Sequence, residues 1–276
     1  MTFYPLLMAP TFRHGSQTPW GGDALRDMLL KDAPDQTGES LEVCLEEGSQ
    51  SMVRGGVLAG QRFDHIVERS GKDLTGLDDA SFPLTVKLVD ARLAQTDENT
   101  QATAWMILSC DEGASIRCGT CGELKVRPGD VYYIPAGTAH TLGAGVLAYE
   151  VQAKNVVPVK ARDGRIYGTT SLCRGGSRTY YVCDSRFEMC RLNISGNMPL
   201  SNGRMHIITP LSPCRIAWGE ENMDVMPYDT VVIPAVLEDV SVECAEGDGK
   251  AIMVSVSDQP SLREELGYRA ENVAGL

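Results

Sequence analysis

One short segment near the middle of the chain, Gly129–His140, constrains the fold more than any other. It reads Gly, five residues, Pro, one residue, Gly, two residues, His. The run from Val131 to Ile134 is β-branched and aromatic, which favours a strand, and the flanking Pro and Gly residues favour a tight turn at each end. The second turn presents His140, a candidate metal ligand because neutral imidazole suits zinc and its neighbours.

This segment resembles the second sequence motif of the cupin barrel, and the chain repeats much of it. A shift of 99 positions lays Arg127–Pro135 over Met226–Pro234, and His140 then falls on Asp239. An internal repeat of this length predicts two stacked barrels. The second copy has kept the turns but lost the glycine and the histidine. We therefore expect the functional site in the first barrel.

The remaining sequence favours an all-β fold. Short β-rich runs are separated by Gly, Pro, Asp and Asn, and helical periodicity is confined to 22–30, 63–69 and a short stretch after Pro260. The same shift of 99 lays Trp105–Leu108 over Arg204–Ile207. The predicted fold class is all-β, with two cupin (jelly-roll, double-stranded β-helix) barrels and a few short helices. The expected parts are an N-terminal barrel over 1–160, a crossover over 161–180, a degenerate C-terminal barrel over 181–259 and a tail over 260–276.

Composition limits the partners. A net charge of −12 and a pI near 4.8 argue against nucleic acid and anionic membrane surfaces. The chain starts without the basic and apolar regions of a signal peptide, and no apolar run reaches spanning length, so we expect a cytoplasmic protein. Nine scattered cysteines fit reduced thiols. Cys118 and Cys121 form a C-x-x-C, for which two free thiols and a zinc or redox pair are the alternatives.

Five motifs together carry a family resemblance. They are Trp20–Asp27, Thr37–Ser40, Phe82–Asp90, Gly129–His140 and Glu150–Gln152. With a similar but less specific second barrel over 186–256, the chain resembles the short bacterial type I mannose-6-phosphate isomerases (phosphomannose isomerases), which are zinc-dependent bicupins. The resemblance covers residues 1 to 257.

The resemblance implies a reaction. In that family mannose 6-phosphate and fructose 6-phosphate interconvert through an enediol. That chemistry needs a group that polarises the carbonyl, a base that moves a proton between C1 and C2, and cations that hold the phosphate. The chain would then be a metal-dependent aldose–ketose isomerase of carbohydrate metabolism. Its partner would be a small-molecule sugar phosphate, and it would act as a monomer or homodimer.

The resemblance also assigns roles to residues. His140 becomes a zinc ligand, Glu150 an acid/base or sugar-orienting carboxylate, and Lys87 a catalytic and substrate-binding cation. Lys160 stands where the family has an arginine, so it keeps the charge without the bidentate fork. Lys160 is thus a candidate catalytic residue as well, and Lys160 and Arg26 are the remaining candidate cations for the phosphate.

The chain departs from the family at the metal site. The family's Gln-x-His-Pro is matched here by Gln95–Glu98, so that Asp97 stands in place of the histidine. The family's metal-binding glutamate two residues before Trp105 is Thr103 here. A site made of Gln95, Asp97 and His140 would be harder and weaker, which favours manganese or magnesium over zinc, and a degenerate site would hold no metal.

Two functions therefore stay open. One is the isomerase, with Lys87 and Glu150 on inner strand faces where an unpaired charge is costly, sharing a cavity with His140. The other is a catalytically impaired cupin of the same family that senses or binds a sugar phosphate. A metal-dependent oxygenase is a weaker third reading, because the chain lacks the His-x-His of the first cupin motif. The other histidines have no ligand spacing, and we expect them on surfaces or strands.

Overall fold

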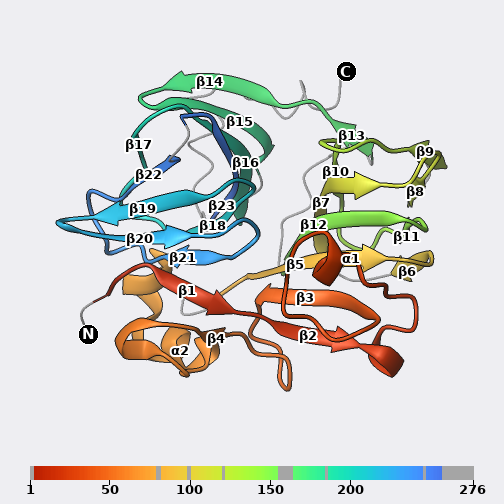
Figure 1. Ribbon diagram of the computed structural model, residues 1–276, viewed down its shortest axis with the longest axis horizontal. Coiled ribbons are helices and arrows are strands. Elements are labelled where there is room, and N and C mark those ends of the chain that lie inside the picture. The colour runs from red at the N-terminus through yellow and green to blue at the C-terminus, as the bar shows by residue number, and fades with distance from the viewer. Residues whose placement is uncertain are drawn as a thin grey trace. The chain divides into compact units, whose positions relative to one another are not determined.

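The computed structural model describes residues 3–78, 82–97, 101–119, 122–154, 164–183, 186–244 and 247–256. It is mostly β and divides into two compact units (Figure 1), which confirms the predicted fold class. The N-terminal barrel comprises the described residues of Pro10–Gln50 and Pro83–Tyr167. The C-terminal barrel comprises the described residues of 1–9, Ser51–Phe82 and Gly168–Gln259. Both units are discontinuous in sequence, unlike the contiguous ranges expected from the repeat, because β1 (Leu6–Ala9) pairs with β21 (Val231–Ile233).

The N-terminal barrel consists of a seven-stranded sheet, in the order β13-β10-β7-β12-β5-β3-β2, and a four-stranded sheet, β6-β11-β8-β9. Both sheets are antiparallel and contribute side chains to one core, Ile107 and Tyr132 from the large sheet and Ile116 and Leu142 from the small one. The elements are β2 (Thr11–His14), η1 (Gly15–Gln17), α1 (Ala24–Asp27), β3 (Thr37–Val43), β5 (Leu84–Ala91), β6 (Gln95–Asp97), β7 (Ala102–Cys110), β8 (Ser115–Cys118), β9 (Glu123–Lys125), β10 (Val131–Ile134), β11 (His140–Leu142), β12 (Val146–Ala153) and β13 (Gly164–Ile166).

The C-terminal barrel repeats this plan. Its eight-stranded sheet has the order β14-β15-β16-β23-β18-β21-β1-β4, and its four-stranded sheet the order β17-β22-β19-β20. The other elements are β4 (Met52–Val53), η2 (Gly56–Leu58), α2 (Phe63–Thr75), β14 (Thr169–Cys173), β15 (Gly176–Cys183), β16 (Phe187–Ile194), β17 (Met198–Pro199), β18 (His206–Pro210), β19 (Cys214–Trp218), β20 (Glu221–Val225), β22 (Ser241–Cys244) and β23 (Gly249–Val256).

The turn motif that dominated the sequence forms as expected. Gly129 has φ +89°, a conformation that other residues rarely adopt, and the Asp130 carboxylate accepts a hydrogen bond from the Arg127 N–H at 3.0 Å. Gly137, with φ +77°, makes the second turn, after which His140 begins β11. The predicted strand Val131–Ile134 is confirmed as β10.

One irregularity in the large sheet matters for the site. Along the β7–β12 pair, Leu147 is opposite Ser109, whereas Ala148 is opposite Ile107, so the register skips Leu108. This is a β-bulge, in which one strand carries an extra residue. Beyond the bulge, Glu150 is opposite Trp105.

The strand registers correct the repeat alignment upstream of the turn. Ile134 pairs with Thr103 in the N-terminal barrel, and Ile233 pairs with His206 in the C-terminal barrel. Thr103 therefore corresponds to His206, a shift of 103 rather than 99 positions, because the segments that join these strands to the turn differ in length. His206 is a strand residue, as expected, and is buried.

The corrected register explains why the C-terminal barrel carries no copy of the predicted site. In the N-terminal barrel Glu150 lies opposite both Lys87 and Trp105. The corresponding positions of the C-terminal barrel pair in the same way and are all buried, but none carries a formal charge: Met253, Cys190 and Ile208.

Helices are few, as predicted. α1 is shorter than the expected 22–30, while α2 is longer than the expected 63–69 and ends at Gly76, a left-handed C-cap with φ +78°. The stretch predicted to be helical after Pro260 lies outside the described residues. None of the described helices has the length and apolar character needed to cross a membrane.

We expect a carboxylate placed at Met253 to destabilise the C-terminal barrel by about 3 kcal/mol or more, because the two residues directly opposite it, Cys190 and Ile208, carry no positive charge. Urea denaturation of Met253→Glu measures the loss. Leu172→Glu, at a position 87% exposed in the same barrel, is the matched control and should be neutral. Adding Cys190→Lys to Met253→Glu should recover part of the loss, and a well-tolerated single variant would contradict the proposed correspondence.

Candidate active site

A buried ion-pair network lies within the N-terminal barrel, and Lys87 of β5 is its centre. Its Nζ is 2.6 Å from Oε1 of Glu39 on β3 and 3.0 Å from Oε1 of Glu150 on β12. All three side chains are at most 8% exposed. Lys87 is two residues from Val89 and Glu150 is two residues from Ala148, both in the core; residues two apart lie on the same face of a strand, so Lys87 and Glu150 face the barrel interior.

The network fixes the charge state of its members. Burial alone would lower the pKa of Lys87, but the carboxylates of Glu150 and Glu39 raise it well above its ordinary value. Burial alone would raise the pKa of Glu39, but the ammonium of Lys87 and the guanidinium of Arg13 hold it below its usual range. Lys87 is therefore a permanent cation near neutral pH, which suits it to donate hydrogen bonds rather than to act as a base.

Arg13 extends the network toward the surface. Its Nη1 lies 3.1 Å from Oε2 of Glu39, and its Nη2 lies 2.6 Å from Oε2 of Glu46 and 3.2 Å from the Ser49 hydroxyl. The charges alternate in sign from Glu46 through Arg13, Glu39 and Lys87. Each buried charge thus has an opposite neighbour, which offsets the cost of taking it out of water.

Trp105 connects the network to His140. The indole Nε1–H donates to Oε2 of Glu150 at 2.6 Å, so both oxygens of this carboxylate are engaged. The indole ring also meets the imidazole edge to face, with ring centroids 5.1 Å apart and an interplanar angle of 73°. The sequence-predicted residues Lys87, Glu150 and His140 are therefore brought together, with Trp105 between the carboxylate and the imidazole.

His140 has the orientation that metal-binding histidines use. It is 3% exposed, and its Nδ1 lies 2.8 Å from the carbonyl oxygen of Thr138. A carbonyl oxygen only accepts hydrogen bonds, so Nδ1 carries the proton in the neutral ring and Nε2 keeps a lone pair. The Nε2 lone pair of His140 is therefore available to bind a metal.

The rest of the expected ligand set is only partly described. The backbone register places Asp97 opposite His140 and Gln95 opposite Leu142, on adjacent strands of the small sheet. The side chain of Asp97 lies outside the described part of the structure. Among the described residues there is no group of three His, Cys, Asp or Glu side chains positioned to hold a metal. Thr103, where the family has a glutamate, is buried opposite Ile134.

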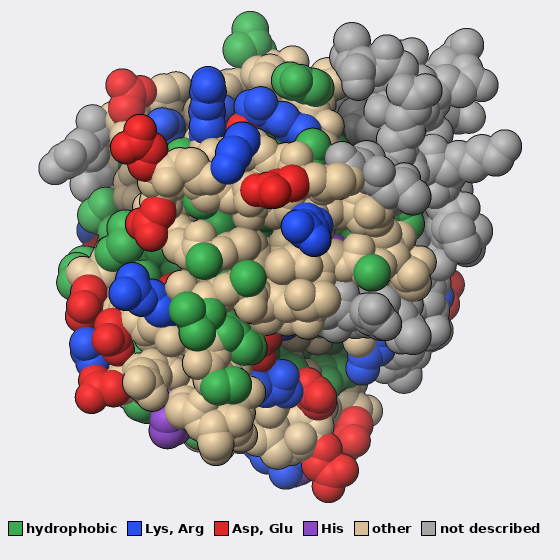
Figure 2. Space-filling view, turned by 90° about the vertical axis from the view of Figure 1, so that its right-hand side faces the viewer, with side chains coloured by type: hydrophobic (Ala, Val, Ile, Leu, Met, Phe, Trp, Pro, Cys, Tyr) green, Lys and Arg blue, Asp and Glu red, His purple; other side chains and the backbone are tan. Residues whose placement is uncertain are grey.

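The two remaining predicted cations are not part of this network. Arg26 lies on α1 with its guanidinium next to three carboxylates, Asp27 at 2.9 Å, Asp23 at 3.6 Å and Asp35. A guanidinium engaged in this way is a poor phosphate ligand. On the face of the molecule shown in Figure 2, basic and acidic side chains are interspersed in the same manner. Lys160 lies outside the described residues.

The sequence reading missed two members of the network. Glu39 had a signal, since it is the acidic residue of the Thr37–Ser40 motif on a strand whose every residue is buried, and a buried carboxylate requires a partner. Arg13 had none, because a single arginine on a short strand looks like an ordinary surface residue. Trp105 served in the sequence only as a marker for the metal-binding position.

We expect Glu39→Gln to lower the free energy of unfolding at pH 7 by roughly 1.5–3 kcal/mol, since it removes a buried charged hydrogen bond. The folded-state pKa of Glu39 is depressed, so its contribution is present above about pH 4.5 and is lost as pH falls through the folded value. The difference between wild type and Glu39→Gln should therefore shrink in acid. Urea denaturation over a pH series measures it. Exposed Glu112→Gln is the control, and a pH-independent difference would contradict the assignment.

Comparison with known proteins gives consistent results. No family model matches the chain. In sequence it is 29% identical over 198 residues to the mannose-6-phosphate isomerase ManA of Bacillus subtilis, which covers 59% of this chain and 62% of the relative. It is 22% identical over 309 residues to the putative mannose-6-phosphate isomerase YvyI of the same organism, covering 88% of this chain and 97% of the relative. The chain thus spans about three-fifths of the length of ManA.

The fold comparison covers more of the chain. The crystal structure of mannose 6-phosphate isomerase from Bacillus subtilis superimposes with a TM-score of 0.78 at 21% identity, covering 91% of this chain and 99% of that one. At this identity the match speaks for the fold, two cupin barrels in one chain. The similarity to mannose-6-phosphate isomerases beyond the fold rests on the sequence relatives and on the sequence motifs. The chain is thus similar in sequence to mannose-6-phosphate isomerases and shares the fold of one of them.

Proposed function

We propose that this protein is a mannose-6-phosphate isomerase that interconverts mannose 6-phosphate and fructose 6-phosphate. The single observation that carries the proposal is the buried Glu39–Lys87–Glu150 network, joined through Trp105 to His140 inside the N-terminal barrel. Charged groups in a protein interior are costly, and a network that serves stability alone is often replaceable by apolar residues without loss. Its position in the barrel that keeps the cupin histidine favours a chemical role.

The proposed chemistry uses the charge states of the network. An aldose–ketose isomerisation moves a proton between C1 and C2 and develops negative charge on the carbonyl oxygen. Lys87, held protonated, would donate a hydrogen bond to a sugar oxygen. Glu150 would orient a sugar hydroxyl or move the proton, with Trp105 and Lys87 fixing the direction of its carboxylate. Lys160 would hold the phosphate.

A metal is proposed for the same site. His140 Nε2, with Gln95 and Asp97 as the other donors, would bind it. Zinc is the family's metal, and the oxygen donors also favour manganese or magnesium. When bound, the metal would polarise the sugar carbonyl. The proposed setting is the cytoplasm, which is consistent with the described cysteines all being free thiols.

The decisive measurement is a coupled assay for fructose 6-phosphate formed from mannose 6-phosphate, on protein treated with a chelator and then given zinc, manganese or magnesium. We expect turnover with at least one metal. Glu150→Gln should reduce kcat by about 100-fold or more, the usual contribution of acid–base catalysis. The matched control, exposed Glu112→Gln, should retain wild-type turnover.

The alternative is a sugar-phosphate-binding cupin without catalysis. It would be supported if mannose 6-phosphate raised the melting temperature while no metal produced turnover. Full activity in Glu150→Gln would instead show that the network is not the site.

A further inference from the structure

Two cysteines of the C-terminal barrel lie directly opposite each other in the small sheet. Cys214 opens β19 and pairs with Cys244, the last residue of β22, in an antiparallel register. Both are free thiols, and their side chains are hydrogen bonded to each other. The proposed isomerase chemistry uses neither residue.

The geometry of this pair suits a covalent bond. Directly opposed residues of antiparallel strands have Cα atoms about 4.5–5.5 Å apart, within the range that a disulfide spans without backbone movement. A glycine makes room for the sulfurs. A methyl group on Gly249 would lie 1.9 Å from Sγ of Cys244, so a larger residue would displace that sulfur, while Sγ of Cys214, at 3.9 Å, would be in ordinary contact.

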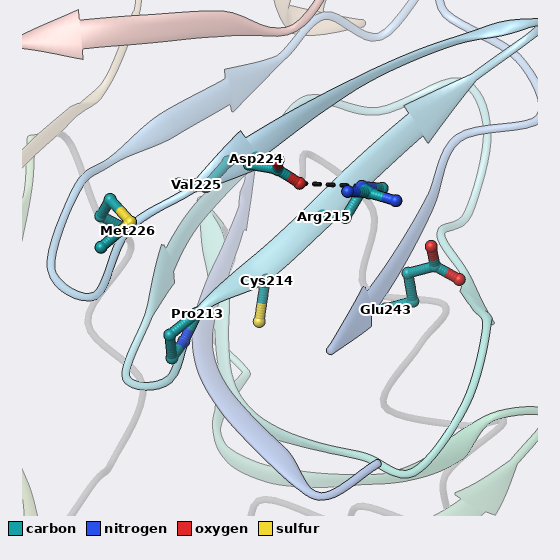
Figure 3. A pocket seen from close by; sticks show the side chains of 7 residues that line it. All are labelled: Pro213, Cys214, Arg215, Asp224, Val225, Met226 and Glu243. Carbon is teal, nitrogen blue, oxygen red and sulfur yellow. Dashed lines mark hydrogen bonds and ion pairs between the residues drawn. The ribbon is translucent and has the colours of Figure 1, made fainter. Parts of the chain in front are cut away.

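The pair lies close to a cavity of the C-terminal barrel. Cys214 lines a cavity of about 320 Å³ together with Arg215, Asp224 and Glu243 (Figure 3). In that view the sulfur of Cys214 points away from the Arg215–Asp224 ion pair, as the alternation of side chains along β19 requires. Cys244 is only partly buried.

The two thiols are chemically unequal. Burial raises the pKa of both, and the hydrogen bond between them raises that of Cys214 further while opposing the rise at Cys244. Cys214 is therefore the donor, and Cys244 loses its proton more readily. The more accessible sulfur is thus also the better nucleophile.

We propose that Cys214 and Cys244 form an oxidisable dithiol site, which a peroxide converts into a disulfide that links β19 to β22. The Cys244 thiolate attacks one peroxide oxygen, forming a sulfenic acid and releasing hydroxide. Cys214 then attacks the Cys244 sulfur, and the S–OH bond breaks as the S–S bond forms. The two thiols lose two electrons, the peroxide gains them, and the thiol protons end in two molecules of water.

The test is peptide mapping of the full-length wild-type protein after hydrogen peroxide treatment at neutral pH. Trypsin should release 205–215 and 216–250, each of which contains one cysteine. We expect these peptides joined, with a mass two hydrogens below their sum, and separated by a thiol reductant. The cross-link closes a loop of about 30 residues, so the melting temperature should rise by roughly 5 °C and return on reduction.

Variants sharpen the result. Cys214→Ser and Cys244→Ser should each abolish the joined peptide and the rise in melting temperature. Cys173→Ser, on β14 of the same barrel, is the matched control and should keep both. Recovery of both wild-type peptides as free thiols, Cys244 over-oxidised without a cross-link, or either peptide joined to another cysteine would overturn the proposal. The mapping needs wild-type protein only, so a variant that fails to fold leaves it decisive.

Discussion

The structure of the N-terminal barrel depends on one interaction, the pairing of the buried Lys87 ammonium with carboxylates. Lys87 tolerates burial because carboxylates from both neighbouring strands reach it, one from β3 and one from β12. This requirement fixes the register of β3, β5 and β12, because a shift of any one of them would leave a buried charge without its partner. It also connects folding to chemistry, because the same contacts that make burial tolerable hold Glu150 in one orientation beside Trp105.

Much of this arrangement could be predicted from the sequence, and the reasons are local. Val131–Ile134 is β-branched and aromatic and lies between two Pro/Gly turns, which strongly favours a strand, so the turn that presents His140 could be predicted. Lys87 and Glu150 could be predicted as site residues because a charge among apolar strand residues is costly to bury without a partner. Their direct pairing could not be predicted, because cross-strand register depends on bulges and loop lengths that carry no clear sequence signal. The repeat alignment failed upstream of the turn for that reason. The metal-site prediction at Gln95 and Asp97 stays a prediction.

The two barrels show how one topology supports different interiors. At corresponding positions the N-terminal barrel has charged partners and the C-terminal barrel has Met253 with uncharged neighbours. Two residues along these strands the C-terminal barrel has a polar pair instead: His206 Nδ1 lies 2.7 Å from the Ser255 hydroxyl, and burial lowers the pKa of His206 to about 4. That imidazole stays neutral near pH 7, and a neighbouring buried charge of this barrel, Glu188 opposite Ser255, is paired with Arg204 at 3.3 Å.

The bulge at Leu108 limits which insertions and deletions such a chain can accept during evolution. Side chains alternate between the two faces of a strand, so losing one residue of β7 between Trp105 and the bulge would turn the indole outward. Glu150 would lose its donor and His140 its aromatic neighbour in one event, although the barrel's hydrophobic composition would hardly change. Loops joining the strands can gain or lose residues without this effect. Lineages of this fold should therefore vary freely in loop length while the residue count of this one strand stays fixed.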